Sequence, residues 1–85
     1  MSNDGSQLIA NVVTDADYDA LRQLASRLTG VLLHRQRTAT DPDEQRGFNA
    51  ERAEVQTRLR DIVPGTAAVG VALVEWGARL RALQP

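Results

Sequence analysis

The chain has 85 residues, a formal net charge of −1 and no cysteine. This length allows one domain with a small core, and the lack of cysteine excludes disulfides, a catalytic thiolate and iron–sulfur clusters. The longest apolar run, residues 67–74, is far shorter than the roughly 20 residues of a membrane span. Because the N-terminus also lacks the positive charge that begins a signal peptide, we expect a cytoplasmic protein without membrane contact.

The first 13 residues are the least regular part of the sequence. Residues 1–7 are small and polar, which predicts a flexible tail. Residues 8–13 are apolar and partly β-branched, which favours either a short strand or an extended arm. We therefore assign residues 1–13 to a flexible or extended N-terminal arm and residues 14–85 to a single helical domain.

The first predicted helix begins after Thr14 and reaches about Arg37. Thr14 is a good N-cap, and Asp17 three residues later completes a capping box with Asp in place of Glu. Apolar residues then follow at alternating steps of three and four, which predicts one buried stripe: Tyr18, Leu21, Ala25, Leu28 and Leu32. Because the stripe continues beyond Gly30, we expect the helix to pass through that glycine.

The second predicted helix begins at the segment Asp41-Pro42-Asp43-Glu44. Asp is a favoured N-cap, and Pro is favoured at the first helical position. The segment Gly47-Phe48-Asn49 offers a second start, so a kink or break there remains an alternative. The apolar spacing ends near Ile62, and Pro64-Gly65 is typical of a helix terminus.

The third predicted helix begins after Thr66, a candidate N-cap. Its apolar residues again recur at steps of four and three: Val69, Leu73, Trp76, Leu80 and Leu83. The dense β-branched residues of 69–74 make a strand the competing interpretation, but the stripe runs on through Leu83 and favours a helix. The sequence therefore predicts an all-α fold, with an antiparallel helical hairpin plus a C-terminal helix.

The first half of the third helix, residues 67–74, is apolar on every side, which requires burial on several sides. One interpretation is that this helix forms the centre of the chain's own bundle. The other is that two further helices cannot cover it and that a second copy or another protein completes the burial. We predict partner contact, and a homo-oligomer, through a stripe that contains a tryptophan, a residue enriched at interfaces: Val69, Gly70, Leu73, Trp76 and Leu80.

All ten basic residues are arginines, and most lie near the ends of predicted helices, where the helix dipole favours them. Two Glu–Arg pairs at the i, i+4 spacing, 54 with 58 and 75 with 79, predict ordinary surface ion pairs. An alternative interpretation groups Arg35, Arg37 and Arg46 into a contact for phosphate or nucleic acid, because guanidinium groups bind phosphate with two hydrogen bonds.

A strand at residues 8–13 followed by the helix start Thr14-Asp15-Ala16-Asp17 resembles a ribbon-helix-helix DNA-binding module. The resemblance implies that the strand would enter the major groove. The sequence departs from that pattern because only Asn11 can read a base edge in the strand and no basic residue precedes Arg22. The second function class is thus a small DNA-binding regulator, for example antitoxin-like, that uses this arm or the Arg35/Arg37 end.

No motif for catalysis or cofactor binding stands out. His34 is the single histidine, and a base or metal ligand needs partners that the surrounding sequence does not supply. The serines do not fit a nucleophile turn, and the glycines do not form a phosphate-binding loop. We therefore expect no enzyme activity, cofactor, metal or small-molecule substrate. The favoured function is a non-enzymatic protein–protein interaction or assembly module, for example a small adaptor.

Overall fold

The fold is known from a computed structural model, which describes residues 15–84. Three helices make up almost all of this range: α2 (Asp15–Thr38), α3 (Pro42–Asp61) and α4 (Ala67–Leu83). Residues 15–84 contain no strand. The predicted all-α, three-helix fold is thereby confirmed. The N-terminal arm and the Thr14 cap lie outside the described residues.

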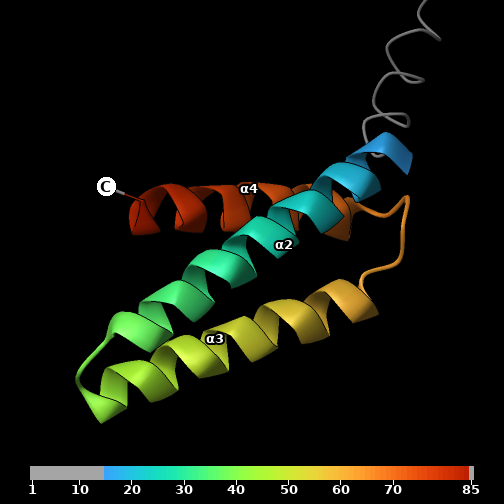
Figure 1. The fold of residues 1–85 in the computed structure, drawn as a ribbon. Coiled ribbons are helices and arrows are strands. Elements are labelled where there is room, and N and C mark those ends of the chain that lie inside the picture. Colours follow the sequence, from blue (N-terminus) through green and yellow to red (C-terminus); the bar gives the residue numbers. More distant parts are fainter. Residues whose placement is uncertain (1–14, 85) are drawn as a thin grey trace, which may run out of the picture.

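The helix α2 is the central element, and the other two helices pack on it (Figure 1). The helix α3 folds back antiparallel to α2, as expected for the hairpin, and α4 then runs in the same direction as α2. The C-terminal ends of α2 and α4 meet where the guanidinium of Arg35 donates a hydrogen bond to the carbonyl of Leu83. Both α3 and α4 are fully described, and no Cα of one lies within 8 Å of a Cα of the other.

The hydrophobic core lies mainly between α2 and α4, and α3 contributes little to it. The buried apolar side chains of α2 belong to the stripe expected from the sequence: Leu21, Ala25, Leu28 and Leu32. Five more come from α4: Val69, Ala72, Trp76, Leu80 and Leu83. Among residues 15–84, α3 contributes only Val55 to the buried set, while Phe48 and Leu59 pack at its margin. Most of the core is therefore an α2–α4 contact.

The start of α3 follows the sequence signals. The side chain of Asp41 accepts a hydrogen bond of 3.1 Å from the backbone N–H of Asp43, and Pro42 takes the first turn. The helix continues through Gly47, so the alternative of a break at that point is wrong. It ends at Asp61, and the following turn contains Gly65 with φ +83°, a left-handed conformation that favours glycine.

Residues 69–74 belong to α4, so the strand alternative is wrong. The preference of β-branched residues for strands is small, and it is outweighed here by burial of the helical stripe against α2. Thr66 occupies the N-cap position, but its hydroxyl donates to the carbonyl of Val63 at 2.7 Å. The threonine therefore stabilises the preceding turn through its side chain.

Candidate functional site

The helix α4 carries two apolar stripes on opposite sides. The inner stripe is the buried set that packs on α2. The second stripe, here called the outer face of α4, recurs at steps of three and four and is exposed throughout: Ala67, Val71, Val74, Ala78 and Ala82. Since residues at this spacing share one side of a helix, the outer face is a continuous strip of small apolar side chains.

Exposed bulky apolar residues are concentrated at this strip. In the described part of the chain, the large hydrophobic side chains that remain exposed are Val63, Val71 and Val74, at 62 %, 52 % and 73 % of their full area. Two of them lie on the outer face, and the third lies in the turn just before α4. Single exposed apolar residues are normal on any surface, whereas a cluster at one place indicates a contact surface.

Ion pairs attach α4 to α3 across the space between their backbones. The guanidinium of Arg79 donates two hydrogen bonds to the carboxylate of Glu51, at 2.6 and 2.8 Å. Arg58 donates to Glu75 at 2.8 Å and places its guanidinium carbon 5.4 Å from the ring centroid of Trp76, within range of a cation–π contact. The hydrogen bond to Glu51 raises the pKa of Arg79 above its ordinary value, against a smaller opposing effect of burial.

The i, i+4 pairs expected from the sequence are therefore wrong, because each arginine binds a carboxylate of the other helix. The physical reason is that α3 and α4 lie too far apart for short apolar side chains to meet. Long arginine and glutamate side chains can span this distance, so each arginine pairs with the other helix. These bridges restrict rotation of α4 about its axis. Burial of the inner stripe on α2 sets the orientation of α4, and the ion pairs support it.

A shallow depression of about 530 Å³ adjoins the N-terminal end of the outer face. Its lining includes Val63, Ala68 and Val71, together with Arg58 and Asp61 from the last turn of α3. The carboxylate of Asp61 is exposed and lies 3.8 Å from its sequence neighbour Arg60. At the opposite end of α4, Arg81 is exposed in the last turn. The depression at one end of the strip thus has charged groups of both signs, and the other end has a basic group.

The structure separates the predicted partner-binding residues into two groups. Val69, Trp76 and Leu80 are buried against the rest of the chain's own core, while Gly70 and Leu73 lie half-buried at its border. A role of these five in partner binding stays a prediction. Sequence reasoning predicted that residues 67–74 are apolar on every side, but it assigned the partner contact to the stripe that the chain itself buries and did not single out Val71 and Val74.

The predicted phosphate-binding arginines lie at the end of the hairpin where α2 passes into α3 (Figure 1). Arg35 is engaged with the Leu83 carbonyl, and Arg46 forms an ion pair with Asp43. Arg37 is exposed in the last turn of α2. Two of the three guanidinium groups thus have partners within the chain, and the proposed contact with nucleic acid stays a prediction.

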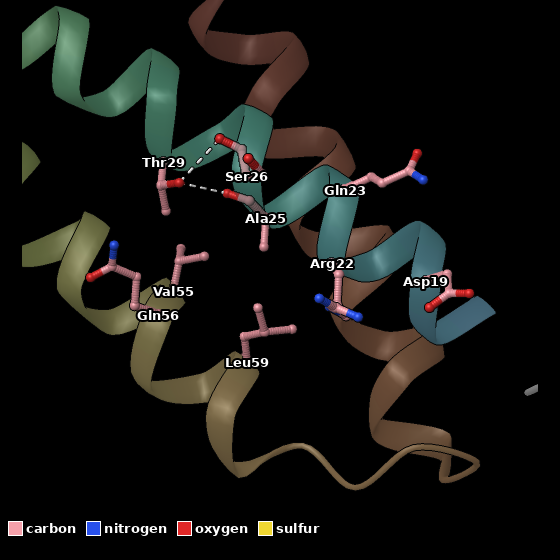
Figure 2. Close-up of a pocket in the computed structure, with 9 residues that line it drawn as sticks. All are labelled: Asp19, Arg22, Gln23, Ala25, Ser26, Thr29, Val55, Gln56 and Leu59. Atoms are coloured by element: carbon pink, nitrogen blue, oxygen red, sulfur yellow. Dashed lines mark hydrogen bonds between the residues drawn. The ribbon is translucent and has the colours of Figure 1, made fainter. Parts of the chain in front are cut away.

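A second surface feature is a groove of about 540 Å³ between α2 and α3. Figure 2 shows its floor, where Ala25, Val55 and Leu59 point into the space between the two helices. The hydroxyl of Thr29 at the rim donates to the backbone carbonyls of Ala25 and Ser26, at 2.9 and 3.1 Å. That hydroxyl proton is therefore committed to the helix itself. His34 lies elsewhere, exposed near the end of α2.

Residues 15–84 contain no cluster of three or more His, Asp or Glu side chains that could hold a metal ion. No helix within this range is long and apolar enough to cross a membrane. Comparison of the chain with protein-family models, with curated proteins and with solved structures gave no match. The function is accordingly inferred from the surface of the molecule itself.

Proposed function

We propose that the chain is a non-enzymatic interaction module that binds an uncharged apolar face of a protein helix through the outer face of α4. The observation that carries this proposal is the exposure of Val71 and Val74 on a helix whose inner stripe is already buried. Covering these two side chains contributes about 1 to 2 kcal/mol each to binding, from the area that they still expose to water.

The composition of the outer face favours a helix as its partner. The side chains of the alanines at 67, 78 and 82 are short, so that the backbone of another helix can approach closely. None of the five outer-face positions carries a charge. Glu75 beside the strip is already paired with Arg58, so a charged partner surface would lose its hydration there without gaining a free counter-charge, which is unfavourable. The expected partner surface is therefore an uncharged apolar helical stripe.

A site-specific photocrosslinking experiment tests this proposal. A photoreactive residue replaces Val74 in cells that produce the protein, and a matched variant carries it at Thr57, an exposed position on α3. We expect one main adduct from position 74, mapped by peptide sequencing to an apolar helical stripe, and little from position 57. Addition of Val71→Glu should remove this adduct, whereas Ala53→Glu on α3 should preserve it.

Other outcomes would overturn the proposal. Equal labelling from positions 74 and 57, or no adduct from position 74, would show that the outer face of α4 has no specific partner. An adduct that persists with Val71→Glu would place the contact outside the apolar strip. Circular dichroism of each variant checks that α4 remains helical, so that a lost adduct reports lost contact.

A further inference from the structure

The hairpin of α2 and α3 is open at one end. The two helices diverge from the turn that joins them toward the N-terminal end of α2 (Figure 1). The groove of about 540 Å³ lies between them, and all its lining residues belong to these two helices. Its floor is formed by Ala25, Val55 and Leu59 (Figure 2), and Leu59 stays only half-buried. The two helices by themselves therefore leave apolar surface uncovered in this groove.

The groove follows a stripe of α2 that leads to the start of the helix. Arg22, Ala25 and Thr29 line it at steps of three and four, and Tyr18 lies one turn closer to the N-terminus on the same side. Tyr18 packs against the core but is itself only half-buried. The groove therefore begins close to Asp15, where the described part of the chain begins.

The chain that precedes α2 carries an apolar segment of matching length. Residues 8–13, here called the arm segment, have the sequence Leu-Ile-Ala-Asn-Val-Val and carry no charge. In extended form, the path from residue 13 back to residue 8 covers about 16 Å. The rise along α2 from Tyr18 to Thr29 is also about 16 Å. An extended arm segment can therefore cover the groove over its whole length.

The start of α2 sets the direction of the arm segment. With Thr14 as the N-cap, Val13 and Tyr18 occupy the two positions of a hydrophobic staple, a contact that fixes the angle at which the chain enters a helix. Since Tyr18 lies on the same stripe as the groove, this contact would bring residue 13 to the end of the groove. The preceding residues would then run back along α2.

The polar rim of the groove suits an extended segment. An extended chain carries backbone N–H and C=O groups that need hydrogen-bond partners when they leave water. The rim offers the side chains of Arg22, Gln23 and Gln56, which together can donate and accept hydrogen bonds. The floor in turn favours the uncharged, apolar side chains of the arm segment, because both surfaces leave water on contact.

From these observations we infer that the groove between α2 and α3 is the docking site of the chain's own arm segment, which runs back along α2 from Tyr18 to Thr29. The short covalent link gives this occupant an effective concentration in roughly the millimolar range, which a separate peptide lacks. No residue of α4 lines the groove, so the inference is independent of the proposed function. A docked arm segment is also not free to enter the major groove of DNA.

An engineered disulfide tests this path, because the chain has no cysteine of its own. On this path residue 10 lies level with Ala25, and Figure 2 shows Val55 and Gln56 across the groove from Ala25. The variant with Ala10→Cys and Gln56→Cys should therefore form an intrachain disulfide on mild oxidation. The matched control pairs Ala10→Cys with Thr57→Cys, an exposed position that does not line the groove. We expect at least about 5-fold less intrachain disulfide from the control, because a disulfide needs close Cα atoms.

A charge in the arm segment gives a second, independent readout. Leu8→Asp would place a carboxylate on the apolar floor and should lower the melting temperature of the chain by about 3–6 °C. Ser6→Asp adds the same charge two residues before the arm segment and should change the melting temperature by less than about 1 °C. Circular dichroism measures both variants beside the natural chain.

Three results would overturn the inference. Equal intrachain yields with positions 56 and 57 would show that the arm segment does not select the groove. Disulfide-linked dimers as the main product would show that the arm segment of another copy reaches the groove instead. A melting temperature of Leu8→Asp equal to that of Ser6→Asp would show that the segment gains nothing from its apolar side chains.

Discussion

The inner stripe and the outer face of α4 both follow the helical repeat, but they differ in the size of their side chains and in the apolar area that they bury. The inner stripe includes Trp76, Leu80 and Leu83, which are at most 6 % exposed. The outer face has nothing larger than valine, and Val74 keeps 73 % of its area exposed. Because the burial energy of an apolar side chain grows with its area, the bulkier stripe takes the surface of α2.

A helical stripe of tryptophan and leucine does not by itself identify an intermolecular contact. Tryptophan and leucine in a helical stripe indicate a strong apolar contact, but the partner in that contact can be the chain's own neighbouring helix. In this molecule Leu21, Leu28 and Leu32 of α2 supply that partner. Small exposed residues on the opposite side then become the better guide to an intermolecular surface.

The largest expected contrast between the two stripes is in folding stability. Trp76→Ala removes the bulkiest buried side chain and leaves a cavity beside α2, which should lower the free energy of unfolding by about 3–5 kcal/mol. For a domain of this size such a loss approaches the total stability. Urea unfolding followed by circular dichroism measures the effect. A loss below about 1 kcal/mol would show that α4 contributes little to the core.

Ion pairs between α3 and α4 support the orientation of α4 that packing on α2 sets. Glu51→Gln removes the carboxylate that binds Arg79 through two hydrogen bonds. We expect a loss of about 0.5–1 kcal/mol, because the pair is partly exposed and water screens it. The exposed residue Glu54, three positions later, provides the control variant Glu54→Gln. The two variants should converge in about 1 M salt, and convergence at low salt would contradict the bridge.

Glycine at the border between the two stripes allows a finer test. A Cβ built at Gly70 meets no atom within 4 Å. Gly70→Ala should therefore raise the free energy of unfolding by about 0.5–1 kcal/mol through helix propensity alone. The contrasting variant Gly65→Ala should lower it by about 1 kcal/mol, because alanine is strained at φ +83°. Thermal unfolding checks both signs, and destabilisation by Gly70→Ala would reveal a close contact there.

The smallest expected effect on stability lies on the outer face itself. Val74→Ser should change the free energy of unfolding by less than about 0.5 kcal/mol, since the valine contacts mainly water in the single chain. Under the proposed function the same variant should weaken binding of the partner helix. The measurement is urea unfolding of the isolated chain. A large loss of stability would place Val74 in the core of the chain.

Local signals predicted the helices well because local interactions form them. The Asp41 cap and Pro42 identify the start of α3, and the four-three spacing through Leu83 identifies α4 as a helix. The pairing of the arginines was not predictable in the same way. The i, i+4 rule describes an isolated helix, whereas Arg58 and Arg79 found carboxylates on a neighbouring helix whose distance the sequence does not state.

The sequence by itself determined the number of helices, their approximate ends and the apolar nature of both sides of α4. These properties arise from capping, propensity and spacing over a few residues. Only the tertiary structure decided which side of α4 packs on α2 and which remains exposed. That choice is a competition among residues far apart in the chain, and the difference in buried area between Trp or Leu and Val or Ala decides it.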